Sequence, residues 1–107
     1  MRAEVENLSS SEDIVQLADM FRLMGDASRL SIILVCLKGP TSVGDIAQRL
    51  GLSASLVSHH LRLLRAARVL RAERRGKQMF YCAADDHIEC VIGDMVAHIG
   101  EPTEETD

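Results

Sequence analysis

The feature that most constrains the fold of this chain is a pair of short apolar segments joined by a single turn. Ser42, followed three residues later by Asp45, has the pattern of a helix N-cap, and Gly51 stands where a helix C-cap is expected. Ser53 then begins a second helix almost at once. Its inner face is expected to carry Leu56, Val57, Leu61 and Leu64. Two short helices connected in this way form a helix-turn-helix.

The apolar periodicity changes from helical to alternating after the second of these helices. Residues 69–73 and 78–82 alternate as strands do, and residues 74–77 between them contain Gly76, which suits a hairpin turn. A hairpin in this position is a wing. The sequence therefore predicts a mainly α (α+β) fold, a winged helix-turn-helix.

Helical patterns flank this unit on both sides. The first is expected from Ser9–Ser11 to Gly25, and its apolar stripe consists of Ile14, Leu17, Ala18, Phe21 and Met24. The second is capped by Asp26 and ends at Gly39-Pro40, and its stripe consists of Leu30, Ile33, Leu34 and Leu37. The last begins near Asp85, and its apolar seam consists of Ile88, Val91, Ile92, Met95, Val96 and Ile99. We expect N- and C-terminal dimerisation helices in a single domain spanning 1–107, with frayed tails at 1–9 and 102–107.

Composition limits the class of protein. A chain of 107 residues with 47% hydrophobic and 3% aromatic content can build one small core, with little room for a catalytic cleft. The polar N-terminus argues against a secretory signal, and the longest apolar run, Ile32–Leu37, is too short to span a membrane. Three cysteines without a CxxC motif do not resemble a disulfide framework. We therefore expect a cytoplasmic protein without membrane contact.

The net charge of −4 conceals a strong segregation of charge along the chain. Residues 62–77 hold seven basic residues and one acidic residue, a local charge of +6, whereas the rest holds five basic and 15 acidic residues, a charge of −10. A basic stripe in an acidic chain is typical of a protein that binds a phosphate backbone. The alternative is a solvated charged face without a ligand.

The predicted winged helix-turn-helix places this stripe against double-stranded operator DNA. The second helix would enter the major groove, and the wing would reach phosphates or the adjacent minor groove. The candidate DNA-binding residues are Ser55, Ser58, His59, Arg62 and Arg65 on the helix and Arg74, Arg75 and Lys77 on the wing. His60, one residue before Leu61, is expected to face the core. A helical hairpin with no role in DNA binding is the alternative.

The last helix carries two pairs of metal-type ligands, Asp85 with His87 and His98 with Glu101. The two histidines are eleven residues apart, which places them on nearly the same helix face but about 16 Å apart along the axis. Because zinc–ligand bonds are only about 2 Å long, one helix cannot bring all four groups to one ion. Two such helices, antiparallel in a homodimer, would form two intersubunit sites with two nitrogen and two carboxylate ligands each. Zn(II) suits this set and Co(II) fits it too; the alternative is a capping aspartate with solvated histidines.

Several of these segments resemble the ArsR/SmtB family of metal-sensing repressors. The resemblance rests on Val43–Ala47, on the stretch from Ser55 to Arg62 and on the wing ending in Phe80-Tyr81, and it covers roughly 17–101. The four predicted ligands match the pattern of the zinc-responsive branch, which has its ligands on the last helix. That branch implies a homodimer that holds its operator when metal-free and releases it when zinc binds. The family's cysteine-based metal sites are absent, since Thr41-Ser42-Val43 stands where one of them would begin.

Two other functions are compatible with parts of the sequence. Some members of the family respond to oxidants or reactive sulfur through cysteines on the second and last helices, where this chain has Cys36 and Cys90. Free cysteines are, however, more often small buried hydrophobic residues. A small zinc hydrolase is a more remote alternative, because four protein ligands would leave no open position for a catalytic water.

Overall fold

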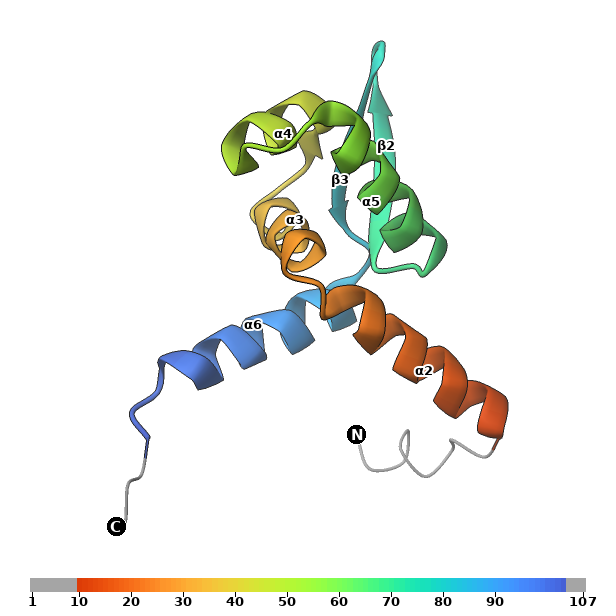
Figure 1. The fold of residues 1–107 in the computed structure, drawn as a ribbon, viewed down its shortest axis with the longest axis vertical. Coiled ribbons are helices and arrows are strands. Elements are labelled where there is room, and N and C mark those ends of the chain that lie inside the picture. The colour runs from red at the N-terminus through yellow and green to blue at the C-terminus, as the bar shows by residue number, and fades with distance from the viewer. Residues whose placement is uncertain (1–9, 104–107) are drawn as a thin grey trace.

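The computed structural model describes residues 10–103 and shows a winged helix-turn-helix (Figure 1). Its elements, in chain order, are α2 (Ser11–Met24), α3 (Ala27–Leu37), β1 (Thr41–Ser42), α4 (Val43–Leu50), α5 (Ala54–Ala66), β2 (Leu70–Arg75), β3 (Gln78–Ala83) and α6 (Asp86–Gly100). Helices α4 and α5 lie with the β2–β3 hairpin at one end of the molecule, and α2 and α6 extend in opposite directions from the other end. The predicted fold class is confirmed. Of the tails expected at 1–9 and 102–107, all but residues 102 and 103 lie outside the described residues.

Side-chain caps set the start of every described helix. In each, the side-chain oxygen of the cap residue accepts a hydrogen bond from the backbone N–H three residues later, which satisfies one of the free donors of the first turn. The cap residues are Ser10, Asp26, Ser42, Ser53 and Asp85. Gly51 ends α4 in a left-handed conformation with φ of 67°, which glycine adopts without steric cost. The expected helix starts and the helix-turn-helix connection are therefore confirmed.

The sheet has three antiparallel strands in the order β1-β3-β2. Strands β2 and β3 pair from Leu70 opposite Ala83 to Arg75 opposite Gln78, so the hairpin turn is only Gly76-Lys77 rather than the predicted residues 74–77. Gly76 again has a positive φ, 62°. Strand β1 was not predicted, because two residues are too few to show an alternating pattern; it pairs Thr41 with Tyr81.

The core lies between α3, α4, α5 and the sheet. Its fully buried large side chains are Ile32, Ile33, Ile46, Leu61, Leu64, Leu70, Val57 and Val69. In α3 the buried residues are Ile32, Ile33 and Cys36. Of the predicted stripe, only Ile33 is fully buried, and Leu30, Leu34 and Leu37 are partly buried against the same core. The stripe is corrected in this way because the helix is covered on more than one side. The prediction for Leu56 is wrong: its neighbour Val57 begins the buried face of α5, and Leu56 remains 40% exposed.

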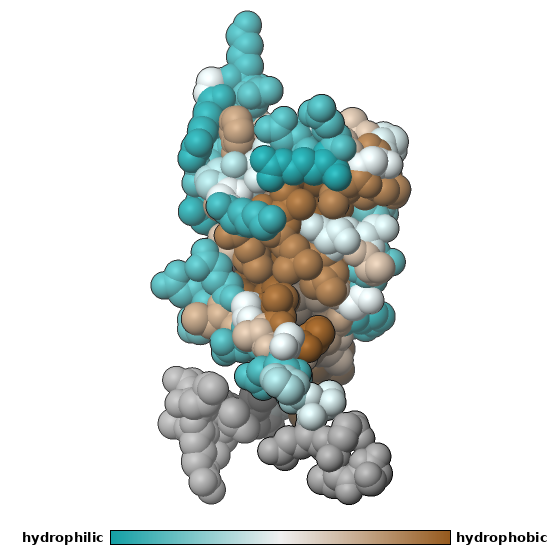
Figure 2. All heavy atoms as spheres, turned by 90° about the vertical axis from the view of Figure 1, so that its left-hand side faces the viewer, coloured by the Kyte–Doolittle hydropathy of each residue, from teal (hydrophilic) through white to brown (hydrophobic). Residues whose placement is uncertain are grey.

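Helices α2 and α6 present apolar side chains that no described part of the same chain covers. In α2 only Met24 of the predicted stripe is buried, and in α6 only Ile88 and Ile92 are buried. The exposed apolar residues are Ile14, Val15, Leu17 and Phe21 on α2 and Val91, Met95, Val96 and Ile99 on α6. Figure 2 shows hydrophobic residues gathered in a band on the side to which α6 extends, below the hydrophilic hairpin end. No helix within 10–103 has the length and apolar character needed to cross a membrane.

Candidate functional site

The predicted recognition helix, α5, separates its polar and buried faces as expected. Ser55, His59 and Arg62 are exposed and Ser58 is half-buried, so the candidate base-contacting residues remain accessible. His60 is buried, as predicted, and burial lowers its pKa. Within the described residues, the Nδ1 atom of His60 has no hydrogen-bond partner. A neutral ring at this position is compatible with the apolar contacts that hold α5 in place.

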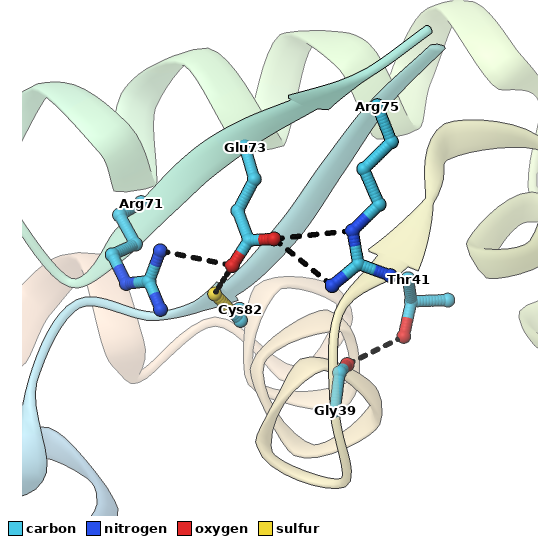
Figure 3. Close-up of polar contacts among 6 residues, drawn as sticks. All are labelled: Gly39, Thr41, Arg71, Glu73, Arg75 and Cys82. Atoms are coloured by element: carbon cyan, nitrogen blue, oxygen red, sulfur yellow. Dashed lines mark hydrogen bonds and ion pairs between the residues drawn. The ribbon is translucent and has the colours of Figure 1, made fainter.

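The wing carries the predicted cations Arg74, Arg75 and Lys77, all exposed. Sequence reasoning missed the role of Glu73, which binds two arginines at once (Figure 3). Its Oε1 accepts hydrogen bonds from Nε and Nη2 of Arg75 at 3.2 and 3.0 Å, and its Oε2 accepts one from Nη1 of Arg71 at 3.1 Å. Arg75 also lies over the ring of Phe80, with Cζ 5.2 Å from the ring centroid.

These hydrogen bonds lower the pKa of Glu73, those from Arg75 most strongly. Glu73 therefore remains ionised and partly neutralises two cations of the basic stripe. The signal was present in the sequence: residues 71, 73 and 75 alternate on one face of a strand, so a single acidic residue between two arginines contacts both.

The first predicted ligand pair, Asp85 and His87, begins α6. Asp85 caps the helix through Oδ1, which accepts a hydrogen bond from the backbone N–H of Ile88 at 3.1 Å. Its other oxygen, Oδ2, lies 3.6 Å from Nδ1 of His87. The cap hydrogen bond lowers the pKa of Asp85, with a further contribution from His87. Asp85 thus caps the helix while one carboxylate oxygen and an exposed imidazole remain available side by side.

The second pair, His98 and Glu101, ends α6. Nδ1 of His98 lies 4.0 Å from Oε1 of Glu101, and both side chains are largely exposed. Within the described part of one chain, no group of three or more His, Cys, Asp or Glu residues is arranged to hold a metal ion. Neither pair by itself supplies enough ligands for a metal site.

The cysteines differ in environment. Cys36 is buried, and burial raises its pKa to about 12, so its thiol resists ionisation. The thiol that adds to this shift is Cys82, which is also buried; Cys90 is exposed. A protonated, inaccessible Cys36 disfavours the thiol-sensor alternative that pairs it with Cys90.

Known proteins share both sequence and fold with this chain. Residues 26–72 match the family described as bacterial regulatory protein, arsR family. The chain is 31% identical over 101 residues to a transcriptional repressor SmtB homolog from Synechocystis sp., a match that covers 94% of this chain and 74% of that protein.

Two solved structures illustrate the shared fold. The homodimeric winged helix-turn-helix DNA-binding domain of a possible ArsR-family regulator from Mycobacterium bovis is similar over 94% of this chain and 95% of that chain, with a TM-score of 0.79 and 20% identity. The AntR antimony-specific transcriptional repressor is similar over 88% of this chain and 86% of that chain, with a TM-score of 0.74 and 24% identity.

The matched residues include the whole helix-turn-helix, and the similarity to the Synechocystis repressor extends over nearly the entire chain. The matched proteins are transcriptional regulators, so they give no support to the hydrolase alternative. The resemblance noted in the sequence is confirmed at the level of the family. The chain belongs to the arsR family of bacterial regulatory proteins.

Proposed function

We propose that this chain is a homodimeric transcriptional repressor that holds operator DNA when metal-free and releases it when Zn(II) binds. Two equivalent metal sites would lie between the subunits, each with Asp85 and His87 from one subunit and His98 and Glu101 from the other. The single observation that carries this proposal is the placement of two exposed ligand pairs at the two ends of α6.

The uncovered apolar faces of α2 and α6 support the dimer. Ile99 is 80% exposed and Phe21 is 56% exposed in the single chain, an unfavourable state for side chains of this size. Burying a side chain of this kind contributes about 1.5–3 kcal/mol, so several of them can hold two subunits together. The similar Mycobacterium bovis domain is homodimeric.

The ligand chemistry supports a metal site shared between subunits. Over the sixteen steps from residue 85 to residue 101, a helix rises about 24 Å, so the two pairs of one chain cannot reach the same ion. An antiparallel arrangement of two α6 helices brings each pair to the complementary pair of the other subunit. Two imidazoles and two carboxylates can complete the tetrahedral shell that zinc prefers, and Co(II) fits the same set. The structurally similar AntR is an antimony-specific repressor, which shows that this fold can serve a repressor specific for a metalloid.

The position of α6 explains how metal could change DNA binding. Helix α6 follows the wing strand β3 after only Ala84 and Asp85. Metal bonds across the interface would fix the relative orientation of the two subunits and therefore the spacing of their α5 helices. Recognition helices must match half-sites about 34 Å apart, so a small change of tilt weakens operator binding.

Fluorescence anisotropy of a labelled operator, with and without Zn(II) at a stated salt concentration, tests the proposal. We expect zinc to weaken binding by the wild type, and His98→Ala to bind DNA normally without responding to zinc. His59→Ala is the matched control, because the same change on α5 should weaken DNA binding and leave zinc affinity unchanged. Equal release of DNA by wild type and His98→Ala would contradict the proposal.

A further inference from the structure

A cavity of about 560 Å³ opens beside the first ligand pair, where α2, the end of α5, β2 and the start of α6 meet. Asp85 and His87 form part of its wall. Three arginines, Arg65, Arg68 and Arg71, line the rest together with apolar residues. The cavity is therefore positively charged, and it shares Asp85 and His87 with the proposed metal site, whereas its arginines are not metal ligands.

Two of the three arginines have no carboxylate partner among the described residues. Arg71 donates to Glu73, whereas neither Arg65 nor Arg68 forms an ion pair within residues 10–103. Arg68 also has φ of 62°, in the left-handed region where glycine is favoured at a helix end. A side chain is disfavoured in this backbone conformation, yet the position holds an arginine.

The chain itself contains a segment of opposite charge. Residues 101–107 hold four acidic residues and no basic residue. They follow directly on α6, at the end that carries His98 and Glu101.

We infer that the acidic segment 102–107 of one subunit docks into the cavity lined by Arg65, Arg68 and Arg71 of the other subunit. The inference rests on the proposed antiparallel dimer, in which Glu101 of the partner subunit meets Asp85 and His87 at the wall of this cavity. Six further residues span up to about 21 Å, enough to carry the partner's Glu104, Glu105 and Asp107 onto the arginines. To reach the cavity of its own subunit, the segment would have to run back about 20 Å along α6, from Glu101 to Ile88, in a fully extended form. The cavity of the other subunit is therefore the favoured target.

Docking would couple the metal to DNA binding through charge as well as through geometry. Arg65 is one of the residues predicted to contact phosphate, and a carboxylate bound to it competes with the DNA backbone. Zinc at Asp85 and His87 adds positive charge at the cavity wall and holds the partner's Glu101 there. The metal therefore favours docking, and docking opposes DNA binding.

Carbodiimide cross-linking of the dimer tests this contact directly. The chain has only two lysines, Lys38 and Lys77, so Arg68→Lys places one new amine in the cavity and keeps its charge. In dimers mixed from light and heavy-isotope subunits, we expect zinc to raise, at least threefold, a cross-link between Lys at 68 and the partner's Glu104, Glu105 or Asp107. Lys38 and Lys77 serve as internal controls. No such cross-link, or one confined to a single subunit, would overturn the inference.

A functional test uses the triple variant Glu104→Gln, Glu105→Gln, Asp107→Asn, which keeps Glu101 as a ligand. We expect wild-type zinc affinity and at least a threefold smaller zinc-induced loss of operator affinity; an unchanged loss would overturn the inference. Arg68→Gly should fold at least as stably as the wild type, since glycine suits its backbone conformation, and should lose the same part of the response.

If the cross-link is missing but His98→Ala still abolishes the zinc response, only the docking is wrong. If zinc has no effect on operator binding, the proposed function itself fails.

Discussion

The two ends of this molecule differ in how far their apolar side chains are buried within one chain. At the helix-turn-helix end, Ile33, Ile46 and Leu64 are completely buried within one chain. At the other end, α2 and α6 leave large apolar side chains such as Phe21 and Ile99 exposed. One chain therefore completes the core of its helix-turn-helix unit by itself, whereas α2 and α6, the second of which carries the proposed metal ligands, leave an apolar face for a partner.

The largest expected effect sharpens this contrast within the folded unit. Ile33→Ala should lower the free energy of unfolding by about 3 kcal/mol, because it removes three carbon atoms from a closely packed site. Ile99→Ala is the matched control, since the same truncation on the exposed face of α6 removes few contacts within the chain. Urea unfolding followed by circular dichroism measures both. If Ile33→Ala and Ile99→Ala lowered the free energy of unfolding of the monomer equally, the two ends of the molecule would not differ in packing.

A second variant places a charge on the exposed apolar face of α6. Met95→Asp on α6 should weaken dimerisation at least about 100-fold, because two symmetry-related charges would enter an apolar interface without partners. The helical signal should stay near that of the wild type, since Met95 is 58% exposed in the single chain. Sedimentation equilibrium measures the association constant. A variant that remained dimeric at the wild-type level would place the interface elsewhere.

At the DNA-reading end, Glu73→Gln keeps the length of the side chain and one of its two acceptor oxygens but removes the negative charge. We expect roughly two- to fivefold tighter binding to non-specific DNA at low salt, an advantage that added salt reduces. Glu12→Gln on α2 provides the same chemical change far from the wing. Tighter binding by both variants, or by neither, would show that Glu73 does not moderate the basic stripe.

The smallest effect concerns the cap of α3. The backbone N–H of Arg29 donates to Asp26 and lowers the pKa of its carboxyl group below the ordinary value. The ionised cap therefore stabilises the fold above the unfolded-state pKa of about 3.9, and this contribution is lost as the pH falls through the lower folded-state pKa. Asp26→Asn accepts the same hydrogen bond without titrating. Urea midpoints between pH 2.5 and 6 should fall less steeply for the variant; parallel curves would contradict this role.

Features governed by neighbouring residues were predictable from the sequence. Ser42, Ser53 and Asp85 cap their helices, and Gly51 ends α4, because capping depends on a few adjacent backbone groups. The closeness of Asp85 to His87 and of His98 to Glu101 likewise followed from their spacing, since residues at helix termini this close in sequence stay close in space. Their role as metal ligands stays a prediction. The fold class followed from the order of these local signals.

Features governed by distant residues were not predictable in the same way. Strand β1 exists because Thr41 meets Tyr81 forty residues later, and the exposure of Leu56 depends on how α5 sits against the core. The burial of Cys36 beside Cys82 is a tertiary property as well. The arginine cavity joins residues from α2, α5, β2 and α6, and its charge emerges only when those elements come together.

The central claim is that each metal ion is shared between two subunits, and mixed dimers test it most directly. One subunit carries Asp85→Ala with His87→Ala, and the other carries His98→Ala with Glu101→Ala. Either variant alone should lack a tight site, whereas the mixed dimer restores one intact set of four ligands. The account predicts one tightly bound Zn(II) per mixed dimer by calorimetry and a tetrahedral Co(II) absorption spectrum. Tight zinc binding by either variant alone, or none by the mixed dimer, would contradict it.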